Sequence, residues 1–105
     1  QQATQIVGPG TVNNAPTGSA FSFGATVEDG NGVRVYSANA TGVIRLVSGP
    51  GAIGGSVKVV GGVATVNLTL SAAGTYIIQI DSGLTDGNGV EIVTYVTVNT
   101  RGRQT

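Results

Sequence analysis

The stretch from Gly62 to Asp81, GVATVNLTLSAAGTYIIQID, alternates apolar and polar side chains with a period of two. Successive residues of a β-strand point to opposite faces, so this pattern predicts two strands that are each apolar on one face. The apolar face of the first strand consists of Ala64, Val66, Leu68 and Leu70. After a tight turn, Tyr76, Ile78 and Ile80 share a face of the second. Two such stripes must be covered, and the rest of the chain has to supply the cover.

Similar alternation outside this stretch predicts further strands, whereas no apolar period of 3.6 residues indicates a helix. The clearest of these strands is Ser19–Glu28, which places Phe21 and Phe23 inward. The other predicted strands are an edge strand at Thr4–Val7 that Val12 resumes, Val43–Val47, Val57–Val60 and Val90–Val98. The chain as a whole therefore predicts an all-β fold, a sandwich of about seven antiparallel strands.

Turn residues punctuate the remaining segments, and the 18 glycines suit an all-β chain. Gly61-Gly62 predicts a two-residue hairpin turn. Loops or turns are predicted at Asn13–Pro16, Ser37–Gly42, Gly49–Gly55 and Ser82–Gly89. This organisation gives an N-terminal edge strand and linker at 1–18, a sandwich at 19–99 and a polar tail at 100–105.

Six large apolar residues are expected to dominate the core: Phe21, Phe23, Val66, Leu68, Ile78 and Ile80. Each such side chain contributes about 1.5–3 kcal/mol when fully buried. A chain of 105 residues can bury a core of this kind without disulfides or metals.

The composition excludes several classes of function. Five basic residues balance five acidic ones, and a net charge near zero provides no field to gather nucleic acid. The absence of cysteine and histidine excludes Ser-His-Asp and Cys-His catalysis and the usual zinc sites. No apolar run approaches the ~18 residues of a membrane-spanning helix, so no membrane insertion is expected. We therefore expect neither an enzyme nor a bound cofactor.

Several segments together carry a resemblance to a known family. Phe21–Asp29 is followed by Gly32-Val33 and Val43–Val47, and Gly62–Val66 is followed by Ala73-Gly74-Thr75-Tyr76. This pattern resembles the bacterial immunoglobulin-like domains of surface and secreted proteins, which are related in shape to invasin and filamin repeats. The resemblance implies an immunoglobulin-like β-sandwich, with the first, second, fourth and fifth strands facing the third, sixth and seventh. It also implies a spacer, stalk unit or adhesive repeat domain that is extracellular or on the cell surface.

The sequence Asp-Gly-Asn-Gly-Val occurs twice, at Asp29–Val33 and at Asp86–Val90. In the strand order of the family, both loops emerge at the same end of the sandwich. One interpretation is a calcium site with oxygen ligands from Asp29, Asn31, Asp86 and Asn88, joined by Asp81. The other is that these are turn residues alone, which we favour because calcium loops usually carry more carboxylates.

A second candidate site is the outer side of the third, sixth and seventh strands. The alternation predicts Val43, Arg45, Val47, Ile77, Val93 and Tyr95 on this side, with Gln79 and Glu91 among them. An exposed apolar patch often marks a contact with a neighbouring protein domain or a second copy. The alternatives are that Val, Ile and Tyr simply suit a pleated surface, or that Val33–Tyr36 folds over part of the patch.

Two further hypotheses concern partners. Gln1–Val7 could donate a strand to the exposed edge of a neighbour, although pairing within its own domain is favoured. A carbohydrate-binding module of a secreted enzyme is the alternative to a structural role, but the chain offers no Trp and three Tyr for stacking on sugars. The sequence thus predicts a non-enzymatic structural or adhesive module that acts as a spacer or assembly unit.

Overall fold

The computed structural model describes residues 2–101 of the chain and contains, within them, eight β-strands and no helix. The strands are β1 Gln5–Val7, β2 Thr11–Ala15, β3 Phe21–Glu28, β4 Ala40–Ser48, β5 Ile53–Val60, β6 Val63–Leu70, β7 Thr75–Thr85 and β8 Glu91–Thr100. The all-β prediction is confirmed. One more strand is present than expected, because Thr11–Ala15 forms a strand separate from β1.

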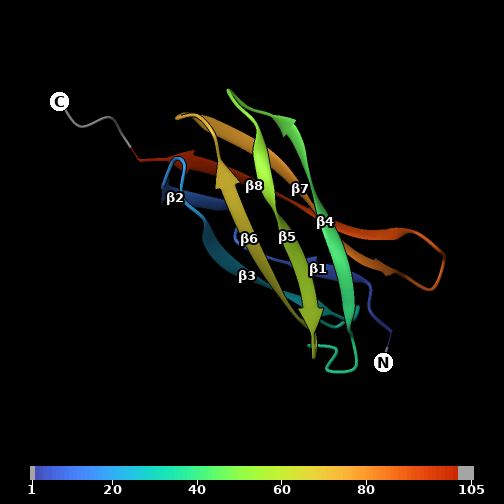
Figure 1. Cartoon of the computed structure of the whole chain (residues 1–105). Coiled ribbons are helices and arrows are strands. Elements are labelled where there is room, and N and C mark those ends of the chain that lie inside the picture. Colours follow the sequence, from blue (N-terminus) through green and yellow to red (C-terminus); the bar gives the residue numbers. More distant parts are fainter. Residues whose placement is uncertain (1, 102–105) are drawn as a thin grey trace.

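The strands form two sheets that face each other across the core (Figure 1). Strand pairing is continuous in the order β1-β3-β6-β5-β4-β7-β8-β2, and β4 divides it into a first sheet of β1, β3, β6 and β5 and a second of β4, β7, β8 and β2. Neighbouring strands are antiparallel except β2, which runs parallel to β8. This is the distribution between sheets that an immunoglobulin-like sandwich requires, and it agrees with the expected one.

Strand β4 belongs to both sheets. Ala40–Gly42 pairs with β5, whereas the following residues of β4 pair with β7. The crossover depends on glycine, because a Cβ on Gly42 would overlap the carbonyl oxygen of Asp81. On the opposite strand, a Cβ on Gly83 would overlap the carbonyl oxygen of Thr41, and Gly83 also has a left-handed φ of 80°. The two backbones therefore lie directly against each other where the chain changes sheet.

The core is aliphatic and combines the inward stripes of both sheets. Both stripes of the Gly62–Asp81 stretch are fully buried. The other large side chains that are almost completely buried are Val27, Val57, Val59, Val96 and Val98. The expected central positions of Val66, Leu68, Ile78 and Ile80 are confirmed.

The expectation that Phe21 and Phe23 dominate the core is wrong. Both rings are half-buried and pack against the core from its margin, with centroids 6.4 Å apart. The reason is topological, since β1 pairs with Thr26–Glu28 at the end of β3 and leaves the start of β3 at the border of the sheet. Alternation identified the correct face but could not indicate how deep along the strand the core lies.

Several strands extend beyond their predicted bounds. Four segments predicted as loop or turn are strand in the structure: Asn13–Ala15, Ala40–Gly42, Ile53–Gly55 and Ser82–Thr85. These segments are rich in small and polar residues, and pairing of their backbones extends the strands where side chains show no alternation. The register of β2 shifts beside Asn14, which has a left-handed φ of 60°. Val90, predicted as the first residue of the last strand, precedes β8 and is exposed.

Tyr76 fastens the connection between β6 and β7. Its hydroxyl donates to the carbonyl oxygen of Ala72 at 2.6 Å and accepts from the N–H of the same residue at 3.2 Å. The buried ring lies against Gly49 in the β4–β5 loop, where a Cβ would overlap it. A tyrosine at the start of this strand, bonded to the backbone a few residues upstream, is a hallmark of immunoglobulin sandwiches.

The molecule is elongated, with dimensions of 51 × 20 × 18 Å. The chain enters β1 from the lower right of Figure 1 and leaves β8 at the upper left, so entry and exit lie at opposite ends. The predicted edge strand and linker at 1–18 contributes β1 and β2. Of the predicted tail at 100–105, residues 102–105 lie outside the described residues, as does Gln1. Residues 2–101 contain no helix with the length and apolarity to cross a bilayer.

Candidate interaction face

Strands β4, β7 and β8 present one broad face away from the core, which we call the outer face. The strand register arranges this face in three rows: Val43-Asp81-Val93, Arg45-Gln79-Tyr95 and Ser48-Ile77-Thr97, with Val47 at a bulge beside the last. The structure therefore brings together all six residues that the sequence placed on this side. Glu91, also expected there, opens β8 on the same side as Val93, and its carboxylate lies close enough to act on Arg45 and Asp81.

The apolar residues of the outer face are largely open to solvent. The exposed fractions are 47% for Val43, 55% for Val47 and 54% for Tyr95. Ile77 is 39% exposed and Val93 is half-buried. No other segment of the described chain covers these side chains to the extent that a core would. In particular, Val33–Tyr36 bonds to β3 and to the β5–β6 turn, through Val35 and Arg34, instead of folding over this face.

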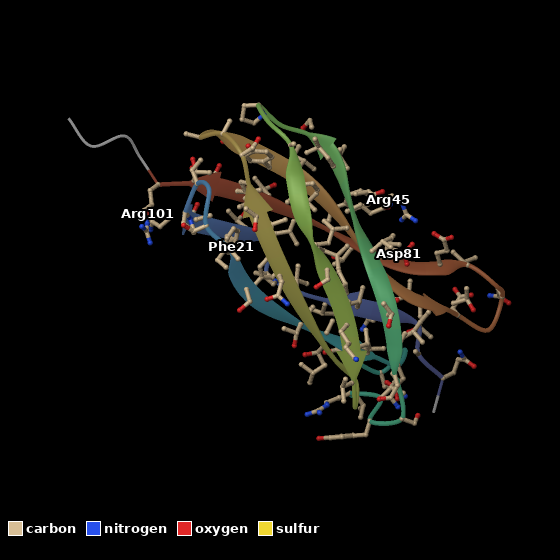
Figure 2. The ribbon with its side chains drawn as sticks, viewed as in Figure 1. Phe21, Arg45, Asp81 and Arg101 are labelled. Atoms are coloured by element: carbon tan, nitrogen blue, oxygen red, sulfur yellow. The ribbon has the colours of Figure 1, made fainter. Side chains whose placement is uncertain are left out.

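Polar side chains link the three strands in the middle of the outer face. The Nη1 of Arg45 donates to the Oδ2 of Asp81 at 2.8 Å and to the Oε1 of Gln79 at 3.0 Å. The Nε2 of Gln79 donates in turn to the hydroxyl of Tyr95 at 3.0 Å. Figure 2 shows Arg45 and Asp81 close together on neighbouring strands. This chain of bonds holds Tyr95 and its neighbours in one arrangement.

Asp81 is the buried member of the ion pair, with 9% of its side chain exposed against 52% for Arg45. Burial by itself would raise the pKa of the Asp81 carboxyl. Hydrogen bonds from Arg45 and from the N–H of Gly83, whose nitrogen lies 2.9 Å from Oδ1, outweigh burial and lower that pKa below its ordinary value. The sequence had suggested Asp81 as a fifth calcium ligand. Its pairing with Arg45 could not be predicted, because it depends on the register between β4 and β7.

We expect Asp81 to set part of the acid sensitivity of the fold. Because its pKa is lowered in the folded state, the ionised carboxylate contributes stability that is complete above its unfolded pKa of about 3.9 and is lost as pH falls through the folded value. Asp81→Asn should therefore flatten the fall in the urea midpoint below about pH 4. Arg45→Gln should do the same, and the double variant should add nothing further. An unchanged acid slope in Asp81→Asn would contradict this assignment.

The two Asp-Gly-Asn-Gly-Val segments form identical turns. In the first, the Oδ1 of Asp29 accepts the N–H groups of Asn31 and Val33 at 2.9 and 3.0 Å. In the second, the Oδ1 of Asp86 accepts those of Asn88 and Val90 at 2.8 and 3.0 Å. Each aspartate thus caps its own turn, which is the structural role that the sequence favoured.

The two turns lie at the same end of the sandwich. Residue Gln2 lies beside Gly87 in one turn, and Thr4 donates its N–H to the carbonyl oxygen of Glu28 before the other. Asp81 is engaged elsewhere, and the residues 2–101 hold no group of three acidic side chains suited to a metal ion. Calcium binding by Asp29, Asn31, Asp86 and Asn88 stays an untested hypothesis.

Two other sequence hypotheses concern the edges and the surface. Gln5–Val7 pairs with β3 of its own chain, in line with the favoured alternative to strand donation. Over the described residues the surface has no pocket that could enclose a ligand.

Solved structures resemble this chain in fold. Domains 4 and 5 of the S-layer protein SbsC match it with a TM-score of 0.59 and 21% identity, over 97% of this chain and 48% of that one. The D0-D1 domain of intimin matches with a TM-score of 0.54 and 22% identity, over 95% of this chain and 50% of that one. The chain therefore spans about half the length of each structure. No family model matches the sequence, and no curated protein matches it significantly.

Proposed function

We propose that this chain is a non-enzymatic structural module of an extracellular or cell-surface protein, serving as a spacer or assembly unit. The observation that carries the proposal is the outer face, an exposed apolar surface on three ordered strands. Support comes from the fold likeness, because one of the similar structures belongs to an S-layer protein. Each match also covers about half of the other chain, as expected for one module among several.

The partner of the outer face is a protein surface, either a neighbouring domain or a second copy. Val43, Val47 and Ile77 offer apolar area, and Tyr95 offers an aromatic ring whose hydroxyl is already bonded. Tyrosine and arginine are enriched at the energetic centres of protein interfaces, and Arg45 and Tyr95 flank Gln79 in the same row. Burial of such a face is driven by the hydrophobic effect and therefore survives high salt.

The double variant Val93→Glu with Tyr95→Ser should abolish self-association through the outer face, which we call lateral, at high salt. The melting temperature should stay nearly unchanged. A buried carboxylate at an apolar contact costs far more than the same group on a free surface. Sedimentation equilibrium of the full chain in high salt measures the loss. The matched control is Val7→Glu with Val90→Thr, which changes exposed residues away from the outer face.

Two results would contradict the proposal. Lateral association that is equal in wild type and double variant would make the outer face ordinary surface. Retention of the chain on an insoluble polysaccharide, lost in the same double variant, would favour the alternative of a carbohydrate-binding module.

A further inference from the structure

The end of the sandwich at which the chain enters carries a patch of exposed apolar side chains. Val33 is 51% exposed, Tyr36 is 66% exposed and Val60 is 58% exposed. The Nε of Arg34 donates to the carbonyl oxygen of Gly61 at 2.9 Å, which ties the first two residues to the turn that follows Val60. We call Val33, Arg34, Tyr36 and Val60 the entry patch.

The entry patch is held in place before any partner arrives. Val35 is buried and donates its N–H to the carbonyl oxygen of Val27 at 2.9 Å. Ala38 is also buried, and its N–H bonds to the carbonyl oxygen of Val35 at 3.1 Å. The guanidinium of Arg34 lies 4.1 Å from the ring centroid of Tyr36. An exposed aromatic ring that is already ordered loses little entropy on binding, which makes it an effective anchor for an interface.

The opposite end, where the chain leaves the sandwich, carries small side chains and a positive charge. Gly74 is in close contact with Pro50, and its carbonyl oxygen accepts the N–H of Thr100 at 3.1 Å. Arg101 follows directly, with its N–H bonded to Ala15, and Figure 2 shows its side chain at this end. Pro50, Ala73, Gly74 and Arg101, all exposed, form what we call the exit patch.

Charge is distributed unequally between the two ends of this neutral chain. Four of the five acidic residues lie near the entry end, in or beside the twin turns: Glu28, Asp29, Asp86 and Glu91. Arg34 and Lys58 offset two of these charges. At the exit end the described residues include Arg101 and no carboxylate. The two ends are therefore electrostatically complementary.

We propose that the entry patch receives the exit patch of a second copy, so that modules stack head to tail along their long axis. This inference rests on the proposed function as an assembly unit and names a second contact surface for it. The contact places the ring of Tyr36 against the flat Pro50–Gly74 surface and brings Arg101 toward the acidic turns. Such a contact joins two different patches, so it continues into open chains instead of closing as a dimer. Its electrostatic part weakens with salt.

Sedimentation equilibrium of the full chain, at millimolar concentration and low salt, tests the proposal. The wild type should form species larger than dimers, and high salt should remove the head-to-tail contacts and leave only association through the outer face. Val33→Thr with Tyr36→Ser should remove entry-end contacts, and Arg101→Glu should remove exit-end contacts, each leaving a chain that does not self-associate head to tail. Val90→Thr, which alters an exposed valine outside both patches, should behave as the wild type. Melting curves verify that every variant is folded.

Mixing the two defective variants separates head-to-tail stacking from other modes. One retains a working exit patch and the other a working entry patch, so the mixture should form dimers that do not grow further. A wild type that stays monomeric at low salt, or stops at dimers, would overturn the proposal. Low-salt association that persists in both patch variants but is lost in Val93→Glu with Tyr95→Ser would also overturn it, while leaving the proposed function intact.

Discussion

Gly42→Ala should destabilise the fold by about 3 kcal/mol, at the upper end of what overpacking costs. A Cβ at Gly42 would overlap the carbonyl oxygen of Asp81, and both groups belong to backbones that pair with their neighbours. The only relief is for β4 and β7 to separate where β4 crosses from one sheet to the other. Urea unfolding followed by circular dichroism measures the loss as a lower midpoint at an unchanged slope.

Gly54→Ala is the matched control for Gly42→Ala. Gly54 also lies within a strand, but a Cβ built there meets no atom within 4 Å. Where the backbone is compatible, alanine in place of glycine stabilises by about 0.4–1 kcal/mol by restricting the unfolded chain. Equal midpoints for Gly42→Ala and Gly54→Ala would show that the crossover tolerates a side chain.

Tyr76→Ala should cost about 3–5 kcal/mol, the range for deleting a buried aromatic side chain. Tyr76 is completely buried, and its hydroxyl makes two hydrogen bonds to the backbone of Ala72. Tyr76→Phe keeps the ring and removes only these bonds, so it should cost about 1–3 kcal/mol. Denaturant unfolding of the two variants separates the contribution of packing from that of the hydroxyl.

Phe23→Ala provides the comparison for Tyr76→Ala. Phe23 is as large as most core residues but half-buried, so its truncation should cost clearly less than that of Tyr76. A Phe23→Ala variant that is destabilised as much as Tyr76→Ala would place the true core toward the start of β3, contrary to the structure.

Alternation in the sequence was sufficient to predict which faces are apolar and that the fold is all-β. Val66, Leu68, Ile78 and Ile80 were recognised because β6 and β7 are buried along most of their length. Alternation shows which face of a strand is apolar but not how deeply each residue along it is buried. For this reason Phe21 and Phe23 were wrongly expected to dominate the core. It also fails where backbone pairing alone defines a strand, as in Ile53–Ser56, whose Gly54-Gly55 and Ser56 carry no stripe.

The candidate sites were predictable to different degrees. The outer face follows from alternation once the sheet is known, so its members were named correctly from the sequence. The partner of Asp81 was not, because pairing with Arg45 depends on the register between β4 and β7 and that register follows from tertiary packing. The entry patch was missed for a similar reason, since Val33–Tyr36 shows its exposed residues only after Val35 is anchored on β3.

The parallel pairing of β2 with β8 has a mechanical consequence. Tension between the two ends of the chain first loads β1 against β3. Once β1 separates, it pulls β2 toward the entry end and β8 toward the exit end, so these two strands are loaded in shear along their common direction. The hydrogen bonds between β2 and β8 then share the force and must rupture together instead of one after another. They run from the Gly10–Thr97 bond to the Ala15–Arg101 bond. The β2–β8 pairing therefore opposes stretching more strongly than a pairing of the same length that opens one bond at a time.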